Sequence, residues 1–144
     1  MADVLERVFE KGDCVYVVDY WGTNDGTQAF EAQAIILNVN LENKTFSAVL
    51  YGDTYQKYSF KDFGRIIFDT YEEACEAANK LPVPKSTVFQ VIGNRVYKKT
   101  VKGIDGCYTD GVFDLVVCFN KGKDVSTREI GISLFMNESD ARRK

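Results

Sequence analysis

The chain has 144 residues, 45% of them apolar and 13% aromatic, and carries a formal net charge of −3 without a single histidine. This composition can bury a core, which excludes wholesale disorder, and the missing histidine excludes Ser-His and Cys-His nucleophiles. The sequence has neither the roughly 18 consecutive apolar residues of a membrane span nor a secretory signal in its first twenty residues, so we expect a cytoplasmic protein.

The first half of the chain predicts short strands. Alternating apolar and polar residues and many valines and tyrosines favour the extended conformation. The expected strands are 14–20, 30–39, 45–51, 56–58 and 65–68. The segment 21–28, which holds two glycines with Asn and Asp, predicts a loop. A single helical turn is expected before the last strand, and Gly64 at positive φ would end it.

A capped helix follows these strands. Thr70 is the predicted N-cap, and Glu73, three residues later, completes a capping box. An apolar stripe at helical spacing follows, made of Ala74, Ala77, Ala78 and Leu81. Glu76 and Lys80 are placed to form an i, i+4 pair on the solvent side.

The same pattern returns 67 residues later. The stretch KDFGRIIFDTYEEA at 61–74 aligns without a gap with REIGISLFMNESDA at 128–141. Upstream of the second stretch, 87–92 and 95–101 predict a hairpin over Gly93-Asn94, and 112–119 predicts a further strand. Asn137 then occupies the N-cap position of a short final helix.

The repeat divides the chain into two units. We expect one unit at 1–81, a proline-containing linker at 82–85 and a second unit at 86–144. Five short strands with a helical turn before the last one resemble the order of an SH3-like barrel, and the opening KGDCVYVV resembles SH3-like, Tudor-like and KOW-type domains. The resemblance implies an α+β, mainly β fold of tandem SH3-like barrels or curled antiparallel sheets, each ending in a short C-terminal helix.

The tripeptide Asp62-Phe63-Gly64 spells the metal-binding motif of protein kinases. Catalysis by that motif requires a glycine-rich phosphate loop, a strand lysine and a catalytic loop, and the second copy has Glu129-Ile130-Gly131 instead. We therefore interpret the motif as a structural turn and not as a catalytic site. We predict no catalytic residue and no cofactor, and hence a protein that is not an enzyme.

The four cysteines also indicate no metal site. None of them belongs to a C-x-x-C pair of the kind that supplies two zinc ligands from one turn. We expect reduced thiols that pack as small apolar groups, and the sequence leaves open whether they cluster. They are Cys14, Cys75, Cys107 and Cys118.

Charge is divided unequally between the copies. Residues 1–80 contain 14 acidic and 7 basic residues, a net charge of −7, whereas residues 81–144 contain 7 acidic and 11 basic residues, a net charge of +4. Opposite charges would let the two units attract each other. They would also let the acidic unit face a basic surface of another protein, since charge of this kind selects partners.

Exposed aromatic residues with nearby acids give the partner-binding candidates. Tyrosine and tryptophan bury a large area at low entropic cost and are favoured anchors of protein interfaces. The predicted partner-binding residues are Trp21, Asp25, Tyr51, Asp53 and Tyr55.

The DFG-x-x-[IL]-F-x-T-x-E-E-A pattern also resembles small accessory proteins of Firmicutes and their phages. The resemblance implies a phage or mobile-element protein that inhibits a host defence nuclease, in the manner of anti-CRISPR proteins. The partner would then be a host protein such as a CRISPR nuclease, with no membrane involved.

The alternative interpretation is a module that binds RNA or single-stranded DNA through the basic second unit. Lysines alternate with other residues along a predicted strand there and could contact phosphates, although lysines also protect sheet edges. The candidate residues are Arg95, Lys98, Lys99 and Lys102.

Overall fold

The computed structural model describes residues 8–23 and 26–143. Its first half runs through β1 (Cys14–Thr23), β2 (Gly26–Asn40), β3 (Thr45–Leu50), β4 (Thr54–Ser59), the 3-10 helix η1 (Phe60–Asp62), β5 (Ile67–Phe68) and α1 (Tyr71–Asn79). Its second half runs through β6 (Thr87–Ile92), β7 (Arg95–Thr109), β8 (Val112–Phe119), β9 (Val125–Ser126), η2 (Thr127–Glu129), β10 (Leu134–Phe135) and α2 (Glu138–Arg142). The two halves therefore have the same order of elements.

The correspondence extends to individual hydrogen bonds around η1 and η2. The N–H of Gly64 donates to the carbonyl of Ile67, and the N–H of Gly131 donates to the carbonyl of Leu134, each over 2.8 Å. Both glycines have positive φ values, +88° and +86°, as expected at the end of a helical turn. The acid–hydrophobe–glycine pattern that recurs at an offset of 67 thus encodes one local structure twice.

The helix caps follow the predicted chemistry. The Thr70 side chain accepts a hydrogen bond from the N–H of Glu73, and the Asn137 side chain accepts one from the N–H of Asp140. Ala74 and Ala78 are the buried residues of α1, and Lys80 lies 3.0 Å from Glu76 on the exposed side. The two N-caps and the Glu76–Lys80 pair are confirmed. In place of the return bond of a capping box, the Glu73 carboxylate accepts a hydrogen bond from the Thr70 hydroxyl.

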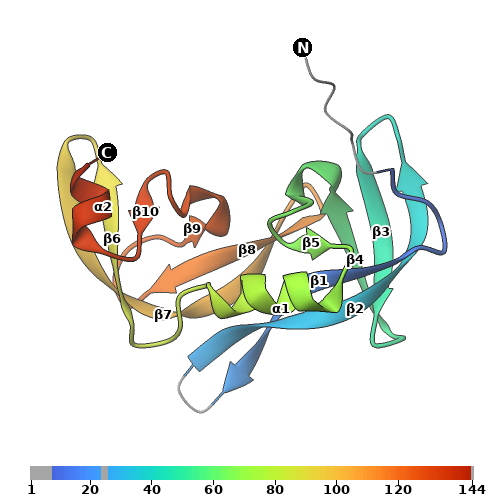
Figure 1. Ribbon diagram of the computed structural model, residues 1–144, viewed down its shortest axis with the longest axis horizontal. Coiled ribbons are helices and arrows are strands. Elements are labelled where there is room, and N and C mark those ends of the chain that lie inside the picture. The colour runs from blue at the N-terminus through green and yellow to red at the C-terminus, as the bar shows by residue number, and fades with distance from the viewer. Residues whose placement is uncertain (1–7, 24–25, 144) are drawn as a thin grey trace.

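The strands form one mixed sheet in the order β10-β6-β7-β8-β4-β3-β2-β1-β5, with β9 paired to β8 (Figure 1). Neighbouring strands are antiparallel except at the centre, where Lys57 of β4 meets Val112 of β8 in a parallel bridge. Because the order starts at β10 and ends at β5, the sheet is open. The α+β, mainly β fold is confirmed, whereas the tandem SH3-like barrels are not shown by this open sheet.

The predicted loop at 21–28 is wrong over most of its length. Trp21 pairs with Gln28, Gly22 with Thr27 and Thr23 with Gly26, so β1 and β2 continue almost to the tip of a long hairpin. The end of this hairpin packs closely on β7, where a Cβ added at Gly103 would clash with Thr27. This tertiary contact outweighs the weak strand propensity of glycine.

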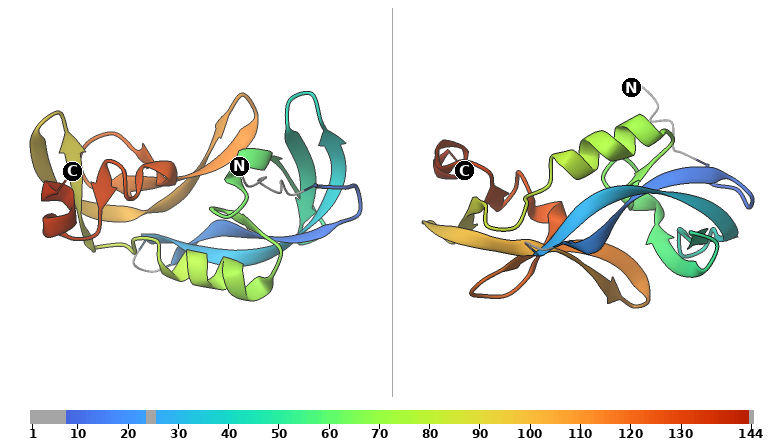
Figure 2. Two further views of the ribbon diagram at one scale, coloured as in Figure 1. Left: turned by 45° about the horizontal axis from the view of Figure 1, so that its top comes forward. Right: turned by 90° about the horizontal axis from the view of Figure 1, so that it is seen from below.

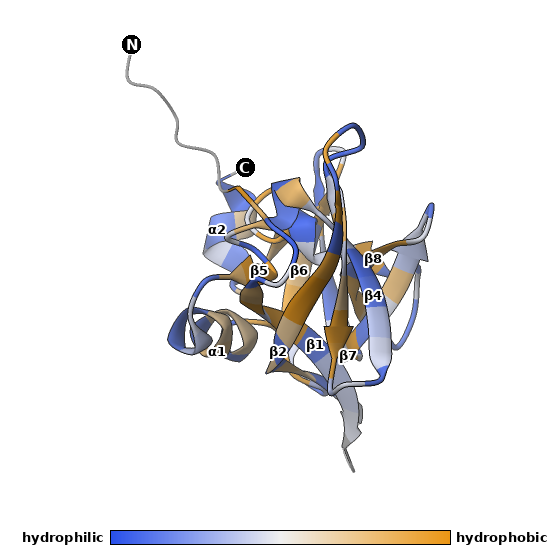
Figure 3. Cartoon of the chain, turned by 90° about the vertical axis from the view of Figure 1, so that its right-hand side faces the viewer, coloured by the Kyte–Doolittle hydropathy of each residue, from blue (hydrophilic) through white to orange (hydrophobic). Residues whose placement is uncertain are grey.

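The core runs through both halves without interruption. Its buried members come from every long strand, and they include Val15, Ile36, Phe46, Ile104 and Leu115. In Figure 3 the strands through the middle of the molecule are hydrophobic over much of their length, whereas α2 is mainly hydrophilic. Within the described residues, no helix is both long and apolar enough to cross a membrane.

An aromatic cluster around Phe113 joins the two halves. The ring of Phe113 in β8 lies 5.6 Å from that of Tyr58 and 6.2 Å from that of Tyr20, both in the first half. The Tyr108 hydroxyl donates a hydrogen bond of 2.9 Å to the side chain of Gln56 in β4. These side chains attach the end of the β7–β8 hairpin to the first half. Figure 2 shows the two halves from two further sides.

A cluster of two arginines and two aspartates forms a second junction. Asp62 is 1% exposed and accepts hydrogen bonds from Arg65, at 2.9 Å, and from Arg128 of the second half, at 3.1 Å. Asp114, which is 5% exposed, accepts one from Arg65 at 2.7 Å. Burial by itself would lower the pKa of Arg128, but hydrogen bonding and charge from Asp62 raise it overall. Asp62 is therefore more than a turn residue, because it ties the two halves together.

Candidate functional site

Three aromatic side chains lie next to one another near the end of the β1–β2 hairpin. Phe30 of β2 lies between Trp21 of β1, with ring centres 5.6 Å apart, and Tyr51 of the β3–β4 turn, with ring centres 6.4 Å apart. Trp21 is 60% exposed and Tyr51 is 58% exposed, while Phe30 is half-buried. We call these three residues the aromatic surface.

Tyr51 occupies an unusual backbone position. The N–H of Asp53 donates to the carbonyl of Leu50, and both Tyr51 and Gly52 have positive φ, +58° and +79°, which is the hydrogen bond and φ pattern of a type I′ turn. Asn, Asp or Gly normally fills the first central position of such a turn, because a larger side chain is strained there. The Tyr51 hydroxyl donates a 3.1 Å hydrogen bond to Asp19, which fixes the ring in place.

Asp19 is a buried carboxylate below the aromatic surface. It is 8% exposed, and burial raises its pKa, whereas hydrogen bonds from the backbone of Tyr20 and from Tyr51 act in the opposite direction. Burial and the charges of Asp19 and Glu31 raise the pKa of the Tyr51 hydroxyl. Within the described ranges, no lysine or arginine forms an ion pair with Asp19.

The structure brings only some of the predicted partner-binding residues together. Trp21 and Tyr51 share the aromatic surface, and Asp53 is exposed beside Tyr51. Tyr55, which is 69% exposed, pairs with Val49 and therefore projects from the other face of the sheet. Asp25 lies outside the described residues.

Sequence reasoning missed two members of this site, Asp19 and Phe30. Both lie inside predicted strands, where an alternating pattern distinguishes the two faces but does not show which face stays uncovered. Only the strand register, in which Asp19 pairs with Phe30, places the carboxylate and the ring side by side at the end of the hairpin.

The basic residues of the second unit do not share one face. Lys98 and Lys99 are consecutive in β7 and project from opposite sides of the strand. The Lys99 ammonium lies 5.3 Å from the centre of the Phe119 ring and bonds to the carbonyl of Lys121. Arg95 is exposed at the start of β7, and Lys102 is exposed at a register shift further along it. These side chains do not form a single phosphate-binding row.

The cysteines are free thiols with different surroundings. Cys14 is exposed, and the other three are half-buried. Burial raises the pKa of Cys75 and Cys107, and it raises that of Cys118 to about 12. Such thiols are poor nucleophiles at neutral pH. Over residues 8–23 and 26–143, no group of three or more cysteine and acidic side chains is placed to hold a metal ion.

Comparisons of the chain with protein-family models, with curated proteins and with solved structures found no match. The surface of the first half combines two exposed aromatic residues, a third ring that supports them and a buried carboxylate with no cationic partner among the described residues.

Proposed function

We propose that the protein is a non-enzymatic binding protein that docks its acidic first unit on a basic surface of another protein. The observation that carries the proposal is Tyr51, an aromatic residue that occupies a strained turn position and is nevertheless 58% exposed. Strain of this kind persists where the surrounding structure enforces it, and it is concentrated at functional sites. A ring held outward at a cost in stability is suited to contact a partner.

Charge supports a basic partner. The acidic unit has a net charge of −7, and Asp19, Glu31 and Asp53 all belong to the surroundings of Tyr51. Tryptophan and tyrosine faces attract ammonium and guanidinium groups. Long-range attraction would speed the encounter, and the aromatic rings would supply the buried contact area.

The partner class follows from the resemblance to phage accessory proteins. A nuclease that binds nucleic acid presents a broad basic groove, and an acidic protein of this size can compete for it. We propose that the protein inhibits a host defence nuclease, such as a CRISPR nuclease, by occupying that groove. This part of the proposal rests on the resemblance and on charge complementarity.

The test is a competition experiment. A guide-loaded CRISPR nuclease is titrated with the protein, and target-DNA binding and cleavage are measured at low and high salt. We expect inhibition that weakens with salt, because the attraction is screened, and a change in fluorescence of Trp21, the only tryptophan of the chain. Trp21→Ala and Tyr51→Ala should each reduce the affinity by tenfold or more, as removal of a central aromatic anchor does.

Tyr97→Ala is the matched control. Tyr97 is an exposed tyrosine of β7 in the second unit, and its removal should leave inhibition unchanged. Inhibition that survives the loss of both Trp21 and Tyr51 would move the docking site elsewhere. Absence of any salt-sensitive complex with such nucleases would refute the proposed partner class.

The SH3-like relation of each unit belongs to the same proposal. Each half has four strands, a 3-10 turn and a short fifth strand that pairs back to the first, β5 to β1 and β10 to β6. That pairing supports curled, SH3-like units even though the whole sheet is open. We propose that the units arose as two copies of such a module.

Nucleic-acid binding by the second unit stays a prediction. Its test is retention on a labelled single-stranded oligonucleotide, with a steep loss as salt rises. Because Lys98 and Lys99 project from opposite faces of β7, charge reversal of each should be measured separately. Retention that neither Lys98→Glu nor Lys99→Glu reduces would argue against this site.

A further inference from the structure

The outer face of β2, β3 and β4 carries two aligned rows of polar side chains. Asn38 pairs with Ser47, and Ser47 pairs with Lys57, so these three residues form one row across the strands. The next row consists of Asn40, Thr45 and Ser59. Paired residues project from the same face of a sheet, so both rows lie on one side.

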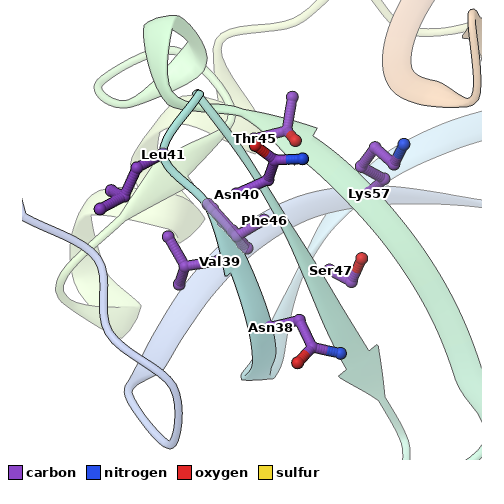
Figure 4. A pocket seen from close by; sticks show the side chains of 8 residues that line it. All are labelled: Asn38, Val39, Asn40, Leu41, Thr45, Phe46, Ser47 and Lys57. Carbon is purple, nitrogen blue, oxygen red and sulfur yellow. The ribbon is translucent and has the colours of Figure 1, made fainter. Parts of the chain in front are cut away.

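All of these residues except Ser59 border a shallow hollow of about 560 Å³, which Val39, Leu41 and Phe46 also line. Figure 4 shows the side chains of Asn38, Ser47 and Lys57 projecting from the same side of their strands, with Asn40 and Thr45 beyond them. The volume lies within the range of roughly 300–1,000 Å³ that is typical of small-ligand sites. The aromatic surface is built from other residues and does not line this hollow.

The hollow is cationic inside an acidic unit. Among the described residues that line it, Lys57 is the only charged one, and none is a carboxylate. Among the residues that the structure describes, the side chains of Asn38, Ser47 and Lys57 make no hydrogen bond or ion pair. A second hollow shares Thr45 with the first and adds Lys61 and Arg128. Lysine, serine and asparagine are side chains that proteins use to contact phosphate oxygens.

We propose that this hollow binds a small phosphate-bearing ligand of nucleotide size. Adjacent strands lie about 4.8 Å apart, so the row from Asn38 to Lys57 spans about 10 Å. That span exceeds one phosphate group and suits a phosphate at Lys57 with its sugar hydroxyls toward Ser47 and Asn38. The ammonium of Lys57 supplies the charge, and the amide and hydroxyl supply hydrogen bonds.

The net charge of the unit does not oppose this ligand. Charges on an exposed surface are screened over about 8 Å at physiological ionic strength. Three acids of the first unit, Glu72, Glu73 and Glu76, belong to α1, which packs on β1 and β2. Among the described residues, the charge that borders the hollow is Lys57. The adjoining hollow adds Lys61 and Arg128 together with the acids Asp110 and Asp114, and Asp114 is already paired with arginine.

The experiment is an NMR titration of the full chain with adenosine monophosphate, adenosine and inorganic phosphate. We expect the nucleotide to shift the backbone amides of residues 38, 47 and 57 and the side-chain amide of Asn38. Adenosine should bind at least tenfold more weakly, because it lacks the charged group that Lys57 contacts. Inorganic phosphate should bind more weakly than the nucleotide, since it spans only part of the row.

Two variants test the assignment. Lys57→Met replaces the ammonium group with an uncharged side chain of similar length. It should reduce nucleotide affinity about tenfold, as loss of a charged hydrogen bond does. Lys98→Met removes an exposed lysine of β7 and should leave affinity unchanged. Equal affinity for phosphate and nucleotide, unshifted amides at millimolar nucleotide, or unchanged affinity in Lys57→Met would each overturn the proposal. None of these outcomes affects the docking proposal, which Trp21 fluorescence reports.

Discussion

The two halves of the molecule have the same order of elements but use equivalent positions differently. Asp62 and Glu129 are the last residues of their 3-10 turns. Asp62 is buried and bonded to Arg128 across the junction, whereas Glu129 accepts a hydrogen bond from Ser133 in its own half. Arg128 is itself the equivalent of the exposed Lys61. Local structure is therefore the same at the repeated positions, whereas the side chains that differ between them make the contact between the halves.

The equivalent phenylalanines show the same division. Phe46 packs on Phe9, Phe60 and Tyr58 within the first half. Phe113, 67 residues later, packs on Tyr58 as well and so connects the halves. Opposite charges also connect the halves, because the arginine–aspartate cluster forms ion pairs across the junction.

The largest expected effect comes from removing the shared ring. Phe113→Ala should lower the free energy of unfolding by about 3–5 kcal/mol, as loss of a fully buried phenylalanine does. Because Phe113 contacts the first half, urea unfolding followed by Trp21 fluorescence should shift together with unfolding followed by circular dichroism. A Trp21 midpoint that stays at the wild-type value would show that the halves unfold independently.

The junction acid should matter more than its repeat equivalent. Asp62→Ala removes a buried ion-pair partner and should lower the free energy of unfolding by about 3 kcal/mol. Larger losses are not expected, because the two arginines left without this partner stay partly solvated. Glu129→Ala removes one half-buried hydrogen bond and should cost about 1 kcal/mol or less. Chemical denaturation of both variants measures the difference, and equal costs would mean that Asp62 is only a turn residue.

A smaller effect is expected at the aromatic surface. Tyr51→Phe keeps the ring and the turn but removes the donor to buried Asp19, and it should destabilise the protein by about 1–2 kcal/mol. The same change in an Asp19→Asn background should cost less, and the double-mutant cycle gives the coupling between the two side chains. No coupling would contradict the hydrogen bond between them.

The last prediction concerns pH. Burial raises the folded-state pKa of Asp19 above its unfolded value, so as pH rises the unfolded chain loses this proton first and stability falls as pH passes through the folded pKa. Asp19→Asn should remove this fall and be more stable at neutral pH than the wild type, since its amide oxygen still accepts from Tyr51. Urea denaturation of both proteins from about pH 4 to pH 7 measures this difference in stability. If Asp19→Asn were less stable than the wild type only at neutral pH, the charged carboxylate would stabilise the fold and the prediction would be wrong.

Local features were predictable because neighbouring residues decide them. The caps at Thr70 and Asn137 and the positive φ of Gly64 and Gly131 depend on side chains within a few residues, and the structure confirms them. The hairpin over Gly93-Asn94 was predictable for the same reason. The loop at 21–28 was not, because its extension into strands depends on contact with β7, far away in sequence.

The candidate site was predictable only as a list of residue types. Trp21 and Tyr51 were named because exposed aromatics suit interfaces, but their link through Phe30 and the buried carboxylate of Asp19 required the register of β1 and β2. The register of β3 and β4 separated Tyr55 from them by placing it on the other face. Pairing partners cannot be read from one strand alone, since a shift of one residue exchanges the faces.

The sequence by itself determined the repeat, the local turns and caps, and the opposite charges of the two halves, because each is a property of composition or of short-range spacing. The tertiary structure alone decided that the strands form one open sheet, that Asp62 and Phe113 join the halves, and which side chains share a face. These outcomes depend on long-range pairing and burial, where packing between distant segments outweighs local preference.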